Sequence, residues 1–326
     1  MTEMNMVEAI RDTLAAEMER DERVIVLGQD VGRLGGVFRA TDGLEERFGE
    51  ERVVDMPLAE GAIAGSAVGL AISGLVPVAE MQFLGFAAQA FHQIEGQVAR
   101  MRYRSGGGLA MPIVIRAPFG GNVRTPELHS DSQEARYVQA PGIKVVAPAT
   151  AADAKGLLTQ AVRDQDPVLY LEPLAGYRLQ RDDVPEGEHT VPFGKLRTVR
   201  EGADVTVVAW SAAVRVAEAA ADLAAAEGIS CSVVDLRTLV PLDEDGLAEA
   251  VARTGRAVVV HEAPCSAGFG AEVIATVQEH AFWSLKAPMA RVTAPDTPYP
   301  IGRLEEHYVP SATRVLAAIR RTAEAG

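Results

Sequence analysis

The chain has 326 residues, of which 48% are hydrophobic and 23% are charged, and its formal net charge is −14. This composition excludes a disordered chain and is typical of a folded protein with about two domains of ~150 residues each. Because it has two cysteines and no run of Lys or Arg, the sequence predicts a reducing compartment and disfavours nucleic acid and anionic membranes as partners.

The first twenty residues form an acidic, amphipathic helical pattern, with Val7, Ile10, Leu14 and Met18 at helical spacing. They lack the basic and apolar regions of a signal peptide. No later apolar run approaches the ~18 residues that span a membrane. We therefore expect a cytoplasmic protein, or one that lies inside an organelle after processing.

In the first half, short runs rich in Val and Ile alternate with helical patterns. Nearly continuous hydrophobicity of this kind is typical of strands buried on both faces of a parallel sheet. The predicted strands are Val24–Gly28, Val76–Met81, Pro112–Ala117, Lys144–Ala147 and Val168–Leu171. Helices are predicted over Met81–Arg104 and Ala151–Arg163.

A polar stretch with Gly and Pro separates the two halves, and we interpret residues 176–195 as a linker between domains 1–175 and 196–326. In the second half, a helix is predicted from an N-cap at Ser211 to a stop at Gly228. The second-half strands are predicted at Val205–Trp210, Ser232–Leu236, Ala257–His261 and Ala290–Val292. The pattern predicts an α/β fold with two domains, each a mostly parallel sheet flanked by helices.

Several common catalytic motifs are missing from the sequence. It contains no phosphate-binding Gly-x-x-x-x-Gly-Lys-Ser/Thr loop, no Cys-x-x-Cys or His-Glu-x-x-His metal spacing and no Gly-x-Ser-x-Gly elbow. A Gly-Phe-Gly pair at Gly268 lacks the third glycine of a dinucleotide-binding turn, which favours a simple turn there. Function therefore has to be inferred from individual side chains.

One carboxylate, Glu60, lies near the start of a predicted helix that ends near Ser73. From spacing alone a structural role is favoured, because an acidic residue at a helix start complements the helix dipole. The predicted strand that follows delivers Gln82 and Phe86 at its carboxyl end, where open parallel sheets bind ligands. Taken alone, Phe86 is equally well explained by core packing.

The order and spacing of many short motifs resemble the β subunits of thiamine-diphosphate-dependent 2-oxo acid dehydrogenases, which are relatives of transketolase. The resemblance covers nearly the whole chain. The matching motifs are Gly28-Gln-Asp30-Val-Gly32, Gly35-Gly-Val-Phe38, Phe48-Gly49, Asp55-Met-Pro-Leu-Ala-Glu60, Arg102-Tyr-Arg-Ser-Gly106, His129-Ser130, Pro141-Gly142, Asp235-Leu-Arg-Thr-Leu239, His261-Glu-Ala-Pro264 and Asp296-Thr-Pro298.

The resemblance implies oxidative decarboxylation of a 2-oxo acid and transfer of the acyl unit to a lipoyl group on an acyltransferase partner. In this family the thiamine diphosphate lies between an α and a β subunit of an α₂β₂ heterotetramer. The α subunit holds the diphosphate and Mg²⁺ through a Gly-Asp-Gly motif. This chain contains no Gly-Asp-Gly, as expected of a β subunit that supplies only the pyrimidine side.

The same resemblance implies roles for four side chains. Glu60 matches the glutamate that hydrogen-bonds a pyrimidine nitrogen and relays a proton, and Phe86 matches the aromatic residue that stacks on the pyrimidine. Gln82 is expected to contact cofactor or substrate. His129 matches a proton donor in acylation of the lipoyl group, although an arbitrary loop histidine more often simply faces solvent.

A structural potassium site is also implied by the family. Its matching positions are Ile113, Ala161, Val162, Asp164 and Asp166. A solvated turn before Pro167 is the alternative. In the second half, Arg237, His261 and Glu262 match motifs of the transketolase C-terminal domain, and we interpret them as interface or structural groups.

The substrate is left open between branched-chain 2-oxo acids, which His261-Glu-Ala-Pro264 slightly favours, and pyruvate. Gly85 and His92 depart from the family's usual aspartates, and Asp131 departs from its usual glutamine. These departures leave Glu60 and His129 in place. A non-catalytic scaffold subunit and a one-chain transketolase-like enzyme are the rival interpretations, and the missing diphosphate motif counts against the second.

Overall fold

Apolar runs of Val, Ile and Ala form the central strands of two sheets in this computed structural model, which describes residues 1–325. The first sheet has seven strands in the order β12-β6-β7-β5-β4-β2-β3. Its strands are β2 (Val24–Gln29), β3 (Val53–Met56), β4 (Val76–Glu80), β5 (Val114–Phe119), β6 (Lys144–Val146), β7 (Val168–Pro173) and β12 (Thr238–Val240). All neighbours pair in parallel except β12, which runs antiparallel to β6.

Helices cover both faces of this sheet, which explains why its central strands are apolar at most positions, with the exceptions of Glu80, Arg116 and Glu172. Buried side chains of α1 (Met6–Arg20) and α8 (Ala151–Arg163) share one hydrophobic cluster with one face of the strands. On the other face lie α3 (Glu60–Ile72) and the segment that follows β4. Asn5 caps α1 with a capping box, and the Thr150 hydroxyl caps α8.

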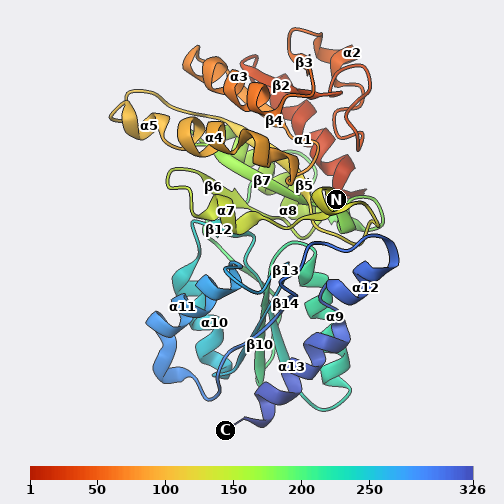
Figure 1. Cartoon of the computed structure of the whole chain (residues 1–326), viewed down its shortest axis with the longest axis vertical. Helices are drawn as coiled ribbons and strands as arrows, with labels where there is room; N and C mark the ends of the chain where they lie inside the picture. Colours follow the sequence, from red (N-terminus) through yellow and green to blue (C-terminus); the bar gives the residue numbers. More distant parts are fainter. Residues whose placement is uncertain (326) are drawn as a thin grey trace.

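The second sheet has five strands in the order β14-β13-β10-β11-β9, and only β9 is antiparallel to its neighbour. The strands are β9 (Arg197–Arg200), β10 (Val205–Ala209), β11 (Cys231–Asp235), β13 (Ala257–Pro264) and β14 (Ala290–Ala294). Its two faces are covered by the helices α9 (Ala213–Ala225), α10 (Glu244–Thr254), α11 (Gly270–Ala281) and α13 (Ala312–Glu324). The predicted fold class of two mostly parallel α/β domains is confirmed, and Figure 1 shows the two domains one above the other.

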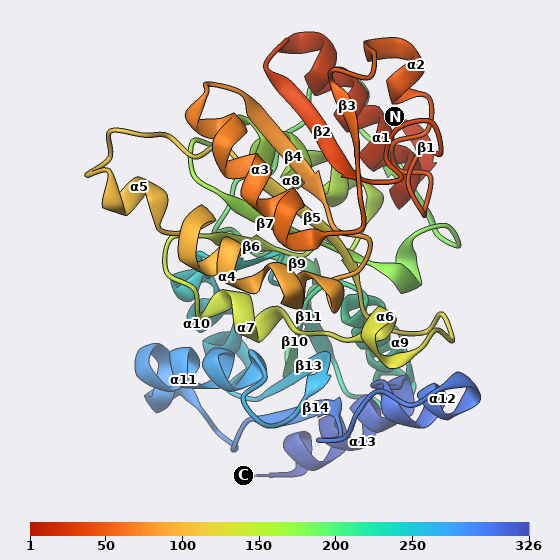
Figure 2. The ribbon, with the colours of Figure 1, turned by 45° about the horizontal axis from the view of Figure 1, so that its top comes forward.

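The remaining elements are short, and several lie where the domains meet. They are β1 (Thr2–Asn5), β8 (Arg181–Val184), α2 (Leu44–Phe48), α6 (Glu127–Ser130), α7 (Glu134–Val138), α12 (Glu305–Tyr308) and the 3₁₀ turns η3 (Leu174–Gly176), η4 (Phe282–Ser284) and η5 (Gly302–Leu304). Figure 2 shows α6 at the junction, on the same side of the molecule as α12. No helix within residues 1–325 is both long enough and apolar enough to cross a bilayer.

The prediction of one long helix over Met81–Arg104 is wrong, because the segment forms several short helical turns. The segment is divided into a 3₁₀ turn η1 (Phe86–Ala90), α4 (Phe91–Gln93), a π turn η2 (Ile94–Val98) and α5 (Met101–Arg104). Glycines at 85 and 96 weaken helix formation. The segment also packs against α3 on one face of the sheet.

The predicted N-cap at Ser211 is also wrong. Ser211 has φ 56°, and α9 begins two residues later without a side-chain cap. An N-cap residue needs an extended backbone for its side chain to reach the helix amides, and the left-handed conformation prevents this.

The expected linker, residues 176–195, is partly built into the first domain. Its strand β8 pairs antiparallel with β1, and Val191 is buried. Contacts also run from the second half into the first, because β12 completes the first sheet and the Arg237 guanidinium donates to Asp153 at 3.1 Å. Hydrogen bonds therefore join the two domains directly, in addition to the linker.

Candidate active site

Glu60 is the first residue of α3, and its side chain is only 5% exposed. The unpaired N–H groups of the helix start favour a negative charge there. Within residues 1–325 the carboxylate has no hydrogen bond or ion pair. Its helix packs against η1, where the Gln89 carbonyl lies 3.6 Å from the position a Cβ on Gly61 would take. A carboxylate without a protein partner, on a residue that is mostly buried, is the feature expected of a group that meets a ligand.

Three aromatic rings meet beside η1. His129, at the end of α6, has its ring centroid 4.6 Å from that of Phe83 and 4.9 Å from that of Phe86, and all three rings meet edge to face. His129 is half-buried, and its Nδ1 atom is buried without a hydrogen-bond partner. The structure thus brings together Phe86 and His129, which the sequence placed on separate segments.

Gln82 lies at the carboxyl end of β4, and its Nε2 atom donates to the Asp30 carboxylate at 3.0 Å. Asp30 follows β2 with a left-handed backbone, φ 60°. The predicted contact of Gln82 with cofactor or substrate therefore involves a side chain already oriented by Asp30. Sequence reasoning named Asp30 only as part of a motif and did not identify this pairing.

A buried ionic cluster lies under this end of the sheet. Arg116 of β5 donates to Glu80 of β4 at 2.5 Å and to both oxygens of Glu172 of β7 at 2.7 and 3.0 Å. The Tyr177 hydroxyl also donates to Glu172. Burial raises the pKa of Glu80, against the opposing charge of Arg116. Arg116 is the one charged residue in an otherwise apolar strand, and this is the sequence signal that points to the cluster.

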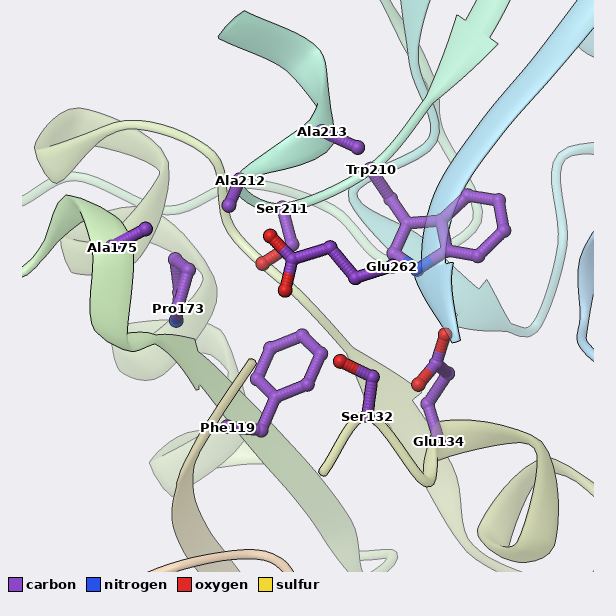
Figure 3. Close-up of a pocket in the computed structure, with 10 residues that line it drawn as sticks. All are labelled: Phe119, Ser132, Glu134, Pro173, Ala175, Trp210, Ser211, Ala212, Ala213 and Glu262. Atoms are coloured by element: carbon purple, nitrogen blue, oxygen red, sulfur yellow. The ribbon is translucent and has the colours of Figure 1, made fainter. Parts of the chain in front are cut away.

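A second set of buried polar groups lies between the domains, in a cavity with room for about one water molecule. Figure 3 shows Glu134 and Glu262 on different sides of it, with Ser211 and Trp210 from the second domain. Both carboxylate oxygens of Glu134 and the Ser211 hydroxyl are buried without partners within residues 1–325. Burial raises the pKa of Glu134 to about 7, and the neighbouring Glu262 adds to this shift.

His261 lies beside this cavity and is fully buried. Its ring stacks on the Trp210 indole with centroids 5.0 Å apart, and both of its ring nitrogens lack partners within residues 1–325. Burial lowers its pKa to about 4, so the imidazole is neutral at ordinary pH. These contacts fit the structural role expected for His261.

We expect Glu134→Gln to stabilise the protein, increasingly so as the pH rises. Since the folded pKa of about 7 lies above the ordinary value of 4.5, the contribution of Glu134 is fully present below pH 4.5 and is lost as the pH rises through 7. Glutamine is neutral throughout. The melting-temperature difference between the variant and wild type should therefore widen by roughly 5 °C from pH 5 to pH 8. The exposed Glu272→Gln is the control, and a difference independent of pH would contradict a buried protonated carboxyl.

The residues predicted for potassium surround the turn between α8 and β7: Ile113, Ala161, Val162, Asp164 and Asp166. Lys144 Nζ donates to both oxygens of Asp164 at 2.7 Å and to Asp166 at 3.3 Å. The Ile113 carbonyl accepts the Val168 N–H at 2.9 Å. The Arg102 guanidinium also donates to Asp166, at 2.7 Å, so both carboxylate side chains have cationic partners, and the potassium site stays a prediction.

The comparisons with known proteins agree with this architecture. Residues 2–179 match the family "Transketolase, pyrimidine binding domain", and residues 194–315 match "Transketolase, C-terminal domain". A solved structure described as "Split gene transketolase, inactive beta4 tetramer" superposes with a TM-score of 0.82 at 26% identity and covers 99% of each chain. A transketolase from Pichia stipitis shares the fold alone, with a TM-score of 0.70 at 15% identity over 98% of this chain and 46% of that one.

Full-length sequence relatives are closer. The "Pyruvate dehydrogenase E1 component subunit beta" of Bacillus subtilis is 50% identical over 324 residues, which are 99% of this chain and 100% of the relative. The protein of the same name from Staphylococcus aureus is 48% identical over the same shares. The chain therefore belongs to the family of transketolase-like β subunits of the 2-oxo acid dehydrogenase first component.

Proposed function

We propose that this chain supplies the pyrimidine side of a thiamine diphosphate site and, with an α subunit, decarboxylates pyruvate and transfers the acetyl unit to a lipoyl group. The observation that carries the proposal is the unpartnered carboxylate of Glu60, a mostly buried residue at the start of a helix that packs against η1, the turn that brings Phe86 to His129. The relatives from Bacillus subtilis and Staphylococcus aureus, which are named as pyruvate dehydrogenase subunits, support it.

The residues present fit one part of thiamine diphosphate. A flat, nitrogen-rich pyrimidine needs a hydrogen-bond partner and an aromatic contact, and Glu60 and Phe86 offer both. The diphosphate and Mg²⁺ need oxygen ligands and N–H groups, and no cluster of three or more metal-ligating His, Cys, Asp or Glu side chains occurs within residues 1–325. This division supports a cofactor shared with an α subunit that holds its charged end.

When bound, thiamine diphosphate supplies the electron sink for decarboxylation. Glu60 then holds a proton on a pyrimidine nitrogen and so sets the protonation state of the ring. Phe86 fixes the orientation of the ring, and Gln82, held by Asp30, lines the same end of β4. The buried Nδ1 face of His129 leaves its Nε2 face as the proton donor for acyl transfer.

The proposed assembly is an α₂β₂ heterotetramer that docks to a lipoyl-bearing acyltransferase. The absence of a diphosphate motif from the sequence makes this chain incomplete on its own. The preference for branched-chain substrates that His261-Glu-Ala-Pro264 suggested has no support among these relatives, whereas the pyruvate alternative does.

The test is reconstitution of the chain with its α partner, thiamine diphosphate and Mg²⁺. Dye-coupled decarboxylation of pyruvate and of 3-methyl-2-oxobutanoate is then measured side by side. We expect pyruvate to have the higher kcat/KM. A preference for the branched acid would restore the first substrate hypothesis, and no turnover by a well-assembled complex would leave the scaffold interpretation.

A further inference from the structure

The loop that leads to His129, residues 120–128, is held by the second domain. Three side chains of that domain accept hydrogen bonds from amides of this loop: Glu262, Tyr299 and Glu305. They accept, in that order, from Gly121 at 3.0 Å, Asn122 at 3.3 Å and Arg124 at 3.1 Å. Three backbone amides of the loop therefore donate to the second domain, which was expected from the sequence to have only an interface or structural role.

The acceptors are themselves fixed. The Tyr299 hydroxyl donates to Glu305 at 2.8 Å, and these two side chains are 5% and 3% exposed. Glu262 extends from the end of β13 toward the end of β5, where the loop begins (Figure 3). Buried acceptors with a fixed geometry hold an amide in one place, which flexible surface side chains do not.

The loop backbone is strained where these contacts are made. Asn122 and Arg124 have φ values of 65° and 57°, in the left-handed region that side-chain-bearing residues rarely adopt. Such conformations persist only where the surroundings impose them. The backbone amides of these two residues are the ones that donate to Tyr299 and Glu305.

The other side of the loop rests on the first domain. A Cβ atom at Gly85 would lie 2.1 Å from the Leu128 carbonyl, so this contact requires glycine. His129 then packs its ring against Phe83 and Phe86 and has no hydrogen bond at Nδ1. Because the imidazole lacks a polar anchor of its own there, its position depends on the loop.

We infer that Glu262, Tyr299 and Glu305 are positioning residues that act through the loop to align His129 for acyl transfer. This inference rests on the proposed function for the role of His129, but not for the existence of the contacts. It gives the C-terminal domain a part in the reaction. Removing a contact should loosen the loop and slow acyl transfer while leaving decarboxylation in place.

The test uses Tyr299→Phe in the reconstituted α₂β₂ complex, because this change removes only the hydroxyl. Hydrogen exchange of the amides in residues 120–128 should accelerate about fivefold. The kcat for acylation of a lipoyl domain should fall roughly tenfold, with KM for the 2-oxo acid and dye-coupled decarboxylation unchanged. Glu305→Gln keeps one acceptor oxygen, so its exchange rate and acylation kcat should lie between those of wild type and Glu305→Ala. His129→Ala gives the acylation kcat expected when the proton donor is lost completely.

Tyr308→Phe is the matched control. Its ring is 4.8 Å from that of Tyr299, but its hydroxyl donates to the Thr297 carbonyl and touches no loop amide. Equal effects from both tyrosine variants, unchanged loop exchange, or faster exchange with normal acylation would each overturn the inference. If wild type turned over no 2-oxo acid, the proposed function would fail, whereas loop exchange would still support or overturn the contacts themselves.

Discussion

Replacing Glu60 with glutamine should lower the dye-coupled decarboxylation rate of the reconstituted complex by about 100-fold or more. Glutamine preserves the volume of the side chain, so packing at the start of α3 is retained. It cannot accept or release the proton that a ring nitrogen requires. The loss should therefore appear in kcat, while the α₂β₂ complex still forms and KM for the 2-oxo acid changes little.

The control for this change is Glu244→Gln. Glu244 is also the first residue of a helix, α10, but it is exposed and lies in the second domain. The same loss of charge at the same helix position should leave activity unchanged. Equal activity of wild type and Glu60→Gln would remove Glu60 from the chemistry and leave it the dipole-complementing role that spacing alone suggested.

Replacing Arg116 with methionine should lower the free energy of unfolding by about 3–5 kcal/mol at neutral pH. Arg116 is fully buried, and its guanidinium is the cation that pairs with both Glu80 and Glu172. Without it, two carboxylates remain buried side by side. Chemical denaturation of the purified protein, followed by circular dichroism, measures the effect.

The loss should shrink as the pH falls. In the variant both carboxyls are buried without their cation, and protonation at low pH removes the repulsion between them. The triple variant Arg116→Met, Glu80→Leu, Glu172→Leu should regain most of the stability, because it leaves no unpaired charge. A single variant as stable as wild type at pH 8 would contradict the charge argument.

Local pattern in the sequence was sufficient to predict most strands and several helices. The strand predicted at Val24–Gly28 is observed over Val24–Gln29, and the helix predicted over Ala151–Arg163 has those bounds. Both succeed because hydrophobic periodicity and N-capping depend on residues that are close in the chain. The long helix predicted over Met81–Arg104 is interrupted, because Gly85 and Gly96 weaken helix formation and Gly85 packs against the Leu128 carbonyl.

For the candidate site, the sequence identified the residues, and the structure showed which of them are in contact. Motif order singled out Glu60, Phe86 and His129, because each lies in a recognisable short segment. Their proposed chemical roles remain to be tested by the variants described above. No periodicity could have shown that the rings of Phe86 and His129 meet, since that contact joins η1 to α6 across the top of the sheet.

The sequence by itself determined the α/β class, the family and the identity of the candidate catalytic side chains. Only the tertiary structure decided which charges are paired and which loops are held. Arg116 joins three strands, Lys144 pairs with Asp164 and Asp166, and Glu305 reaches the His129 loop from the far end of the chain. The physical reason is that hydrophobic periodicity depends on residues that are close in the chain. Hydrogen bonds between buried groups depend instead on segments that are far apart in the chain and meet only in the folded protein.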